Sequence, residues 1–142
     1  MWVRRTTQEM IYTDIIMDTY HGVIIVESLE DTSVLDEVNI ISTKIEQVSE
    51  ATKTPWLKVW TLHTVEIPPG KIDAVAHNVS QSIDREHAHA WYADFRNDET
   101  HYIIFRGKIF VIDVHNQSQY DEVKCYGITI GIPDAQMAFV AA

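Results

Sequence analysis

The stretch from Ala90 to His115 constrains the fold most strongly, because two turns divide it into three short apolar runs. Aromatic and β-branched residues dominate these runs, which is typical of strands. Arg106 and Gly107 form a two-residue hairpin turn with glycine at a position that favours a positive φ, so Phe105 should lie opposite Lys108. The stretch therefore predicts a three-stranded antiparallel meander.

The first turn of this meander, Arg96 to Glu99, fixes a second register. A loop of two residues or of four gives the same pairing, with Asp94 opposite His101 and Tyr92 opposite Ile103. A loop of three or five residues would break this pairing. The prediction thus places a carboxylate directly across from an imidazole.

Alternation along the strands gives the meander two different faces. One face suits burial under helices and carries Trp91, Ala93, Phe95, Tyr102, Ile104, Ile109 and Val111. The other mixes apolar and ionisable side chains and carries Tyr92, Asp94, His101, Ile103, Phe105, Lys108, Phe110 and Ile112. Such a mixture favours a second, less complete interface. We expect a ligand or partner surface there, formed by Tyr92, Asp94, His101, Ile103 and Phe110.

The remaining elements precede and follow the meander. Apolar runs predict strands over residues 23–29, 40–48 and 57–67. Helices are predicted around Val34 to Val38, from Ile72 to Ile83, and from Ser118, which resembles the start of a capping box, to Gly131. This order indicates an α+β protein with a ferredoxin-like (split βαβ) antiparallel sheet. The C-terminal meander would extend this sheet, and the helices would lie mainly on one face.

The other sheet face would then expose apolar side chains from residues 23–26 and from the meander. We expect a partner subunit or the N-terminal segment to cover it. Residues 1–20 read as an N-terminal extension of uncertain structure, because helix and strand patterns fit them equally well. Residues 21–142 are expected to form a single α+β domain, since 142 residues suffice for one core.

Charge and cysteine content limit the classes of partner and the location. The formal net charge is −10, from 21 acidic residues and 11 Lys and Arg, so we expect no nucleic-acid binding. The apolar runs are too short to span a bilayer, so no membrane association is expected. A single cysteine, Cys125, agrees with a reducing cytoplasm. We expect a cytoplasmic protein.

Common catalytic and cofactor motifs are missing from the sequence. It contains neither a glycine-rich phosphate loop nor a dinucleotide fingerprint nor a serine nucleophile elbow, and we expect no cofactor. His87 and His89 are two residues apart and would share one face of a strand, where they could bind a metal with a third ligand. The ordinary interpretation, a polar strand entry, is favoured, so no metal site is predicted.

The Asp94 and His101 pair is the better candidate for chemistry. A carboxylate opposite an imidazole would raise the histidine pKa and fix its tautomer, as an orienting acid does for a general base. Tyr92 would lie on the same face. The simpler interpretation is a cross-strand ion pair worth about 0.2 to 1 kcal/mol. Whether the protein is an enzyme stays open at this point.

Three segments, Trp91 to Phe95, Ile104 to Phe110, and Gly131 to Pro133, resemble small uncharacterised prokaryotic α+β proteins. The likeness spans residues 23–137 and implies a single compact domain without implying an activity. Two hypotheses remain. The first is a non-enzymatic binding or interaction module that forms a homo-oligomer, a dimer through its open sheet face. The alternative is a small enzyme that uses Asp94, His101 and Tyr92.

Overall fold

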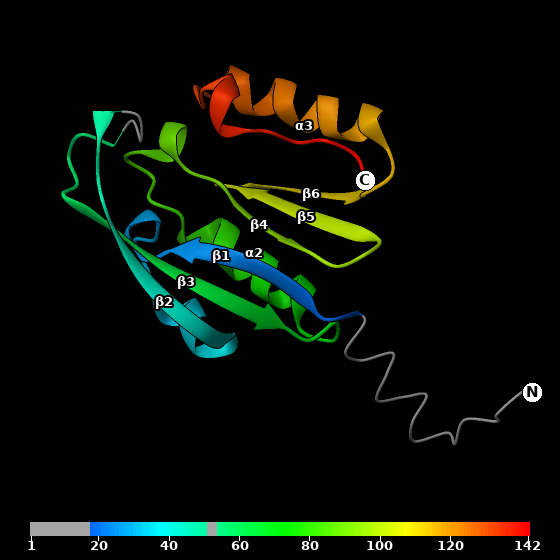
Figure 1. Cartoon of the computed structure of the whole chain (residues 1–142), viewed down its shortest axis with the longest axis horizontal. Helices are drawn as coiled ribbons and strands as arrows, with labels where there is room; N and C mark the ends of the chain where they lie inside the picture. Colours follow the sequence, from blue (N-terminus) through cyan, green and yellow to red (C-terminus); the bar gives the residue numbers. More distant parts are fainter. Residues whose placement is uncertain (1–17, 51–53) are drawn as a thin grey trace, which may run out of the picture.

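The computed structural model describes residues 18–50 and 54–142. It is an α+β protein built on one open, six-stranded antiparallel sheet with the strand order β2-β3-β1-β4-β5-β6 (Figure 1). The strands are β1 (Tyr20–Ile25), β2 (Asn39–Gln47), β3 (Val59–Ile67), β4 (Ala93–Arg96), β5 (Thr100–Phe105) and β6 (Lys108–Asp113). Within the described ranges, no helix is both long and apolar enough to cross a bilayer.

Two α-helices accompany the sheet, α2 (Ile72–Ser82) and α3 (Gln117–Thr129). The helix expected around Val34 is instead the short 3-10 element η2 (Ser33–Glu37). The first strand also differs from its prediction, because β1 starts at Tyr20 and gives way to the 3-10 turn η1 (Val26–Ser28). Tyr20, the last residue of the predicted N-terminal extension, therefore belongs to the sheet. Residues 1–17 lie outside the described part of the chain.

Helix α2 packs on one face of the sheet because its apolar residues recur at helical spacing. Ile72, Val75, Ala76 and Val79 are all buried. They join the predicted inner face of the meander in one core, whose meander members are Trp91, Ala93, Phe95, Tyr102 and Ile104. The prediction for this face is confirmed, except that Val111 is 54% exposed.

Helix α3 lies on the opposite face, over the meander (Figure 1). Its Tyr120 and Val123 form a second core with Ile103, Phe105 and Ile112 from the strands. The expectation that the helices lie mainly on one face is therefore wrong. It is also wrong that a partner or the N-terminal segment must cover the meander, because α3 and the chain after it do so.

The start and end of α3 have identifiable causes. Asn116 caps the helix by accepting a hydrogen bond from the Gln119 backbone N–H at 3.2 Å, which replaces the capping box predicted at Ser118. Gly131 has a φ of 104° and stops the helix as predicted. At Gly127 a Cβ would lie 2.2 Å from Met137 Sδ. Glycine there lets the following chain pack directly against the helix.

The meander registers are confirmed at one turn and wrong at the other. Phe105 pairs with Lys108 across Gly107, whose φ is 72°. At the first turn Asp94 pairs with Ile103, and His101 pairs with Arg96, two positions from the prediction. A shift of two positions leaves every side chain on its predicted face.

Candidate ligand-binding site

A pocket of about 410 Å³ lies where β1, β3 and β4 meet the C-terminal segment. Its described lining is mostly apolar or aromatic, consisting of Val23, Ile25, Trp60, Ala90, Trp91, Tyr92, Asp94 and Gln136. Trp60 and Trp91 are neighbours, with ring centroids 5.6 Å apart. Among these eight residues Asp94 is the only one with a carboxyl group, and none is basic. A concave apolar site with few polar groups is the usual form of a small-molecule site.

Asp94 and His101 meet although they are not paired across the strands. Asp94 Oδ2 is 2.7 Å from His101 Nε2, because both side chains project from the same sheet face at diagonal positions. The His101 side chain is 5% exposed, while that of Asp94 is 39% exposed. The Asp94 carboxylate thus lines the pocket, and the buried His101 imidazole holds it in place through the hydrogen bond.

Tyr120 of α3 completes a chain of three groups. Its hydroxyl is 2.8 Å from His101 Nδ1. A carboxylate only accepts hydrogen bonds, so His101 Nε2 carries a proton toward Asp94. Burial raises the pKa of Tyr120, so its hydroxyl keeps a proton that it can donate to Nδ1. The three side chains thus form one continuous hydrogen-bonded chain that ends at the carboxylate of Asp94.

Tyr92, the third predicted site residue, forms a wall of the pocket. Its hydroxyl donates to the backbone oxygen of Gln136 at 2.6 Å. Burial, together with the charge of Asp94, raises the pKa of Tyr92 to about 12. The hydroxyl therefore stays protonated at neutral pH and ties β4 to the C-terminal segment.

Two residues of the predicted ligand surface, Ile103 and Phe110, pack under α3. Ile103 is fully buried beneath α3. Phe110 packs against Tyr126 of the same helix, with ring centroids 5.4 Å apart. Ile103 therefore belongs to the protein's own core, and Phe110 lies half-buried at the edge of that core.

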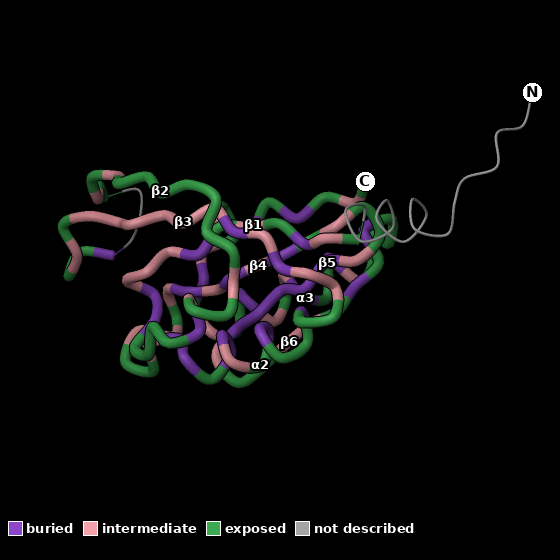
Figure 2. The backbone as a smooth tube through the Cα atoms, turned by 90° about the horizontal axis from the view of Figure 1, so that it is seen from below, coloured by how far each residue is buried: buried purple, intermediate pink, exposed green. Residues whose placement is uncertain are grey.

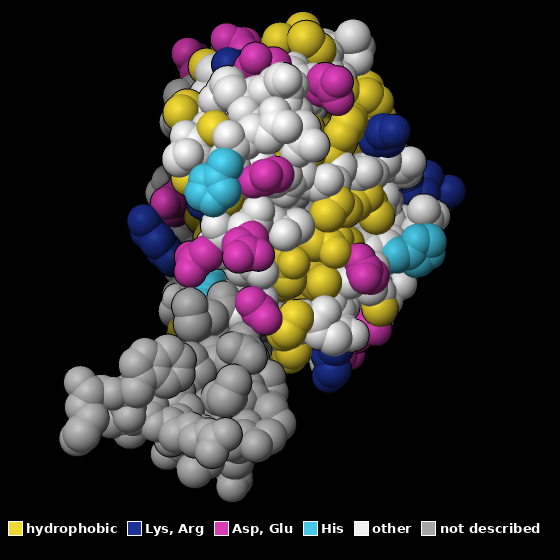
Figure 3. Space-filling view, turned by 90° about the vertical axis from the view of Figure 1, so that its right-hand side faces the viewer, with side chains coloured by type: hydrophobic (Ala, Val, Ile, Leu, Met, Phe, Trp, Pro, Cys, Tyr) yellow, Lys and Arg dark blue, Asp and Glu magenta, His cyan; other side chains and the backbone are white. Residues whose placement is uncertain are grey.

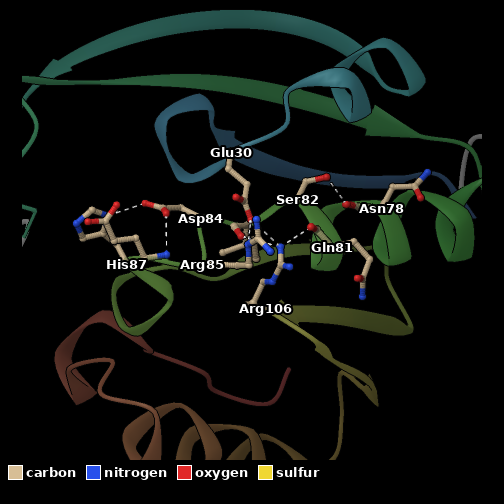
Figure 4. Close-up of polar contacts among 10 residues, drawn as sticks. Glu30, Asn78, Gln81, Ser82, Asp84, Arg85, His87 and Arg106 are labelled. Atoms are coloured by element: carbon tan, nitrogen blue, oxygen red, sulfur yellow. Dashed lines mark hydrogen bonds and ion pairs between the residues drawn. The ribbon is translucent and has the colours of Figure 1, made fainter.

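His87 and His89, the weak metal candidates, lie in an aromatic group and not on a strand face. Their ring centroids are 6.2 Å apart, and His87 stacks on Trp56 at 3.8 Å. His87 Nδ1 is 2.6 Å from Asp84 Oδ2 (Figure 4). Within residues 18–50 and 54–142, no group of three or more His, Cys, Asp and Glu could hold a metal.

A second polar cluster, also shown in Figure 4, has a structural role. Arg106, from the turn between β5 and β6, donates to the carbonyl oxygens of Gln81 and Ile83 at the end of α2. The same guanidinium lies 3.0 Å from Glu30. A cation there complements the negative end of the helix dipole. This cluster fixes the meander to α2 and leaves the pocket as the better candidate site.

Trp60, Tyr120 and Gln136 are among the pocket and network residues that sequence reasoning missed. Tyr120 carried a signal, because it begins the apolar stripe of the predicted C-terminal helix. Trp60 lies in the strand predicted over residues 57–67, and Gln136 lies beyond the predicted C-terminal helix. The contacts of Tyr120 and Gln136 depend on which sheet face α3 crosses.

The chain matches no protein-family model, no curated protein and no solved structure. The resemblance to small prokaryotic proteins stays a prediction. The case for a function therefore depends on the pocket and on the residues that line it.

Proposed function

We propose that this protein is a non-enzymatic binding module that holds a small organic ligand in the pocket between β1, β3, β4 and the C-terminal segment. The observation that carries the proposal is a single anchored carboxylate, Asp94, in an otherwise uncharged apolar wall. Such a wall contributes affinity through burial of apolar surface, and one polar group orients the ligand.

An NMR fragment screen with the full-length chain tests this proposal. Fragments should shift the backbone amides of Val23, Trp91 and Asp94 together. The variant Ala90→Phe fills the pocket and should abolish these shifts. Ala88→Phe places the same side chain in the same short turn, η4 (Ala88–Ala90), outside the lining, and should preserve them. If no fragment at millimolar concentration perturbs the pocket amides, the proposal is wrong.

Self-association through the open part of the sheet face belongs to the same proposal. Helix α3 covers the meander, so the open part is formed by β1, β3 and β2. Val23 on this face is 42% exposed, and Trp60 beside it is half-buried. Sedimentation velocity should show a concentration-dependent dimer that Val23→Glu disrupts. A dissociation constant of about 1 mM marks weak binding. A protein that stays monomeric at all concentrations up to about 1 mM would therefore contradict the proposed self-association.

The alternative function, a small enzyme, is favoured by one observation. The chain from Tyr120 through His101 to Asp94 orients a carboxylate at an apolar pocket, which suits a general base. The probe is 5-nitrobenzisoxazole, whose C–H proton a base removes while the ring N–O bond breaks to give a phenoxide. Turnover above buffer that Asp94→Asn abolishes would support this alternative. A rate equal to that of buffer would exclude Asp94 as such a base.

We also propose finer descriptions of fold and location. The order β2-β3-β1-β4 supports a ferredoxin-like arrangement that β5 and β6 extend, although 3-10 turns stand where its first helix would be. The net charge of −10 argues against nucleic-acid partners. Acidic side chains spread over the face shown in Figure 3, with Lys and Arg at its margins. The single free cysteine, Cys125, supports a reducing, cytoplasmic location.

A further inference from the structure

The pocket carries a charge preference, and we infer that its ligand is an organic cation, with a protonated amine or a methylated ammonium group next to an apolar body. This inference rests on the proposed function, because it names the chemical class that the same pocket takes. It depends on three features of the lining: the charge of Asp94, the aromatic walls, and the lack of other metal-binding groups among the described lining residues.

The first feature is a carboxylate that hydrogen bonds hold at the pocket wall. Asp94 accepts a hydrogen bond from His101, and Tyr120 can donate to the other ring nitrogen of that histidine. This network holds the carboxylate in place at the pocket wall. The Asp94 side chain is 39% exposed and belongs to the pocket lining. None of the other described lining residues is basic, so a cation on the ligand is the natural counter-charge.

The second feature is the aromatic wall. Trp60, Trp91 and Tyr92 all line the pocket. The face of an aromatic ring attracts a cation through its quadrupole, and tryptophan does so most strongly. An aromatic wall next to a carboxylate therefore favours a cation over a neutral group of the same shape. An anionic ligand would meet the like charge of the carboxylate.

The third feature separates an organic cation from a metal ion. A hard metal ion requires several oxygen or nitrogen ligands. The described lining offers one carboxylate, and its remaining side chains are aliphatic or aromatic apart from Gln136. The group of three metal-binding side chains that such a site needs is not found in residues 18–50 and 54–142. An apolar body with one cationic nitrogen fits these walls, whereas a bare ion does not.

Three probes with the same indole ring test the charge preference. Tryptamine is cationic at pH 7, tryptophol is neutral, and indole-3-acetate is anionic. Each is titrated into the full-length chain while the amides of Val23, Trp91 and Asp94 are followed by NMR. Tryptamine should bind about tenfold more tightly than tryptophol, as expected for one charge-assisted contact. Indole-3-acetate should bind most weakly.

A matched pair of variants assigns the preference to Asp94. Asp94→Asn keeps the side-chain shape and an oxygen acceptor for His101, and it should reduce the tryptamine preference to about onefold. Asp98→Asn changes the net charge by the same amount in the turn between β4 and β5, outside the lining, and should keep the preference. If Asp94→Asn fails to fold, the ranking of the three probes on the wild-type chain decides alone.

The outcomes separate this inference from the proposal on which it rests. Equal affinity for tryptamine and tryptophol, or tightest binding of indole-3-acetate, would overturn the cation preference while the pocket still binds a ligand. The same holds if uncharged fragments shift the pocket amides and tryptamine does not. If neither these probes nor the fragment screen shifts the pocket amides, both the inference and the proposed function are wrong.

Discussion

The two ends of the sheet contrast in how they are covered. Strand β5, in the meander, has five of its six residues buried, with α2 on one face of the sheet and α3 on the other. Strand β2, at the far edge, has eight of its nine residues exposed (Figure 2). Both strands form backbone ladders with their neighbours, β2 with one strand and β5 with two. The meander end and the β2 end of the sheet therefore differ mainly in how many of their side chains are buried, and less in their strand pairing.

The pocket lies between these two ends. Its lining comes from β1 and β3, at the less covered end, and from the start of β4, where the covered meander begins. A ligand there would contact a well-packed wall and a more accessible one. Stability should therefore be lost mainly by changes in the meander, while changes at β2 should have little effect. The following predictions test this division.

The largest effect is expected from Phe105→Ala. Phe105 is fully buried under α3, with its ring 5.0 Å from that of Tyr126. Deleting an aromatic ring from a core leaves a cavity and costs about 3 to 5 kcal/mol of the free energy of unfolding. Urea denaturation measures this cost. A loss below about 1 kcal/mol would show that the second core contributes little to stability.

Gly22→Ala should rank next, because it acts where β1 joins β4. A Cβ at Gly22 would lie 2.2 Å from the backbone oxygen of Asp94 and 2.7 Å from Phe95. The backbone must shift, and we expect a loss of about 1 to 3 kcal/mol. Gly70→Ala is the control, since nothing lies within 4 Å of its added Cβ. Equal effects of the two substitutions would contradict the tight β1 to β4 contact.

Tyr120→Phe tests the network behind the pocket. It removes the hydroxyl 2.8 Å from His101 Nδ1 and leaves a buried imidazole nitrogen without that partner. The expected loss is about 1 to 3 kcal/mol. Tyr126→Phe removes a hydroxyl from a half-buried position on the same helix and should cost less than about 0.5 kcal/mol. If both variants unfold at the same urea concentration as wild type, the network does not contribute to stability.

Alkaline pH should weaken the fold through its buried tyrosines. Burial and Asp94 raise the pKa of Tyr92 to about 12, and burial with the hydrogen bond to Asp73 raises the pKa of Tyr102. In the unfolded chain tyrosine ionises near about pH 10. The folded state therefore binds more protons above that pH, so stability is full below about pH 10 and falls as pH rises toward about 12. Urea denaturation over this range should show a shallower decline for Tyr92→Phe. An unchanged slope would contradict the raised pKa of Tyr92.

The smallest effect is expected from Ile45→Ala at the edge of the sheet. Ile45 is 65% exposed on β2. The substitution removes little buried surface and should change the free energy of unfolding by less than about 0.5 kcal/mol. A loss comparable to that of Phe105→Ala would show that β2 is covered in solution.

Sequence alone predicted the meander, its two faces and the contact of Asp94 with His101. A hairpin loop that is longer or shorter by two residues leaves each side chain on the same face of the sheet, so these predictions did not require the exact loop length. The exact pairing was not predictable from loop length. The Asn97 side chain accepts hydrogen bonds from the backbone N–H groups of Glu99 and Thr100, at 3.0 and 2.8 Å. Because of this Asx-type turn, Asp98 and Glu99 form the two-residue loop between β4 and β5. The pairing of β4 with β5 is therefore shifted by two positions from the prediction.

The side of the sheet that α3 covers could not be read from local patterns. Its buried stripe is narrow, with Tyr120, Val123 and Gly127, and would fit either face. Tertiary packing decides between them, through contacts such as that of Gly127 with Met137. The burial of Ile103 under α3 and the contact of Tyr120 with His101 could not be predicted for this reason.

The hydrogen bond from Tyr92 to Gln136 joins residues 44 positions apart. During synthesis, the strand that carries Asp94 leaves the ribosome well before Gln136 does. At about 5 to 20 residues per second, this delay is roughly 2 to 9 s. The meander ends at Asp113 and α3 at Thr129, so at the same rate the complete meander spends roughly 1 to 3 s without α3 above it. During that interval chaperones that recognise apolar surface have access to Ile103 and Phe105.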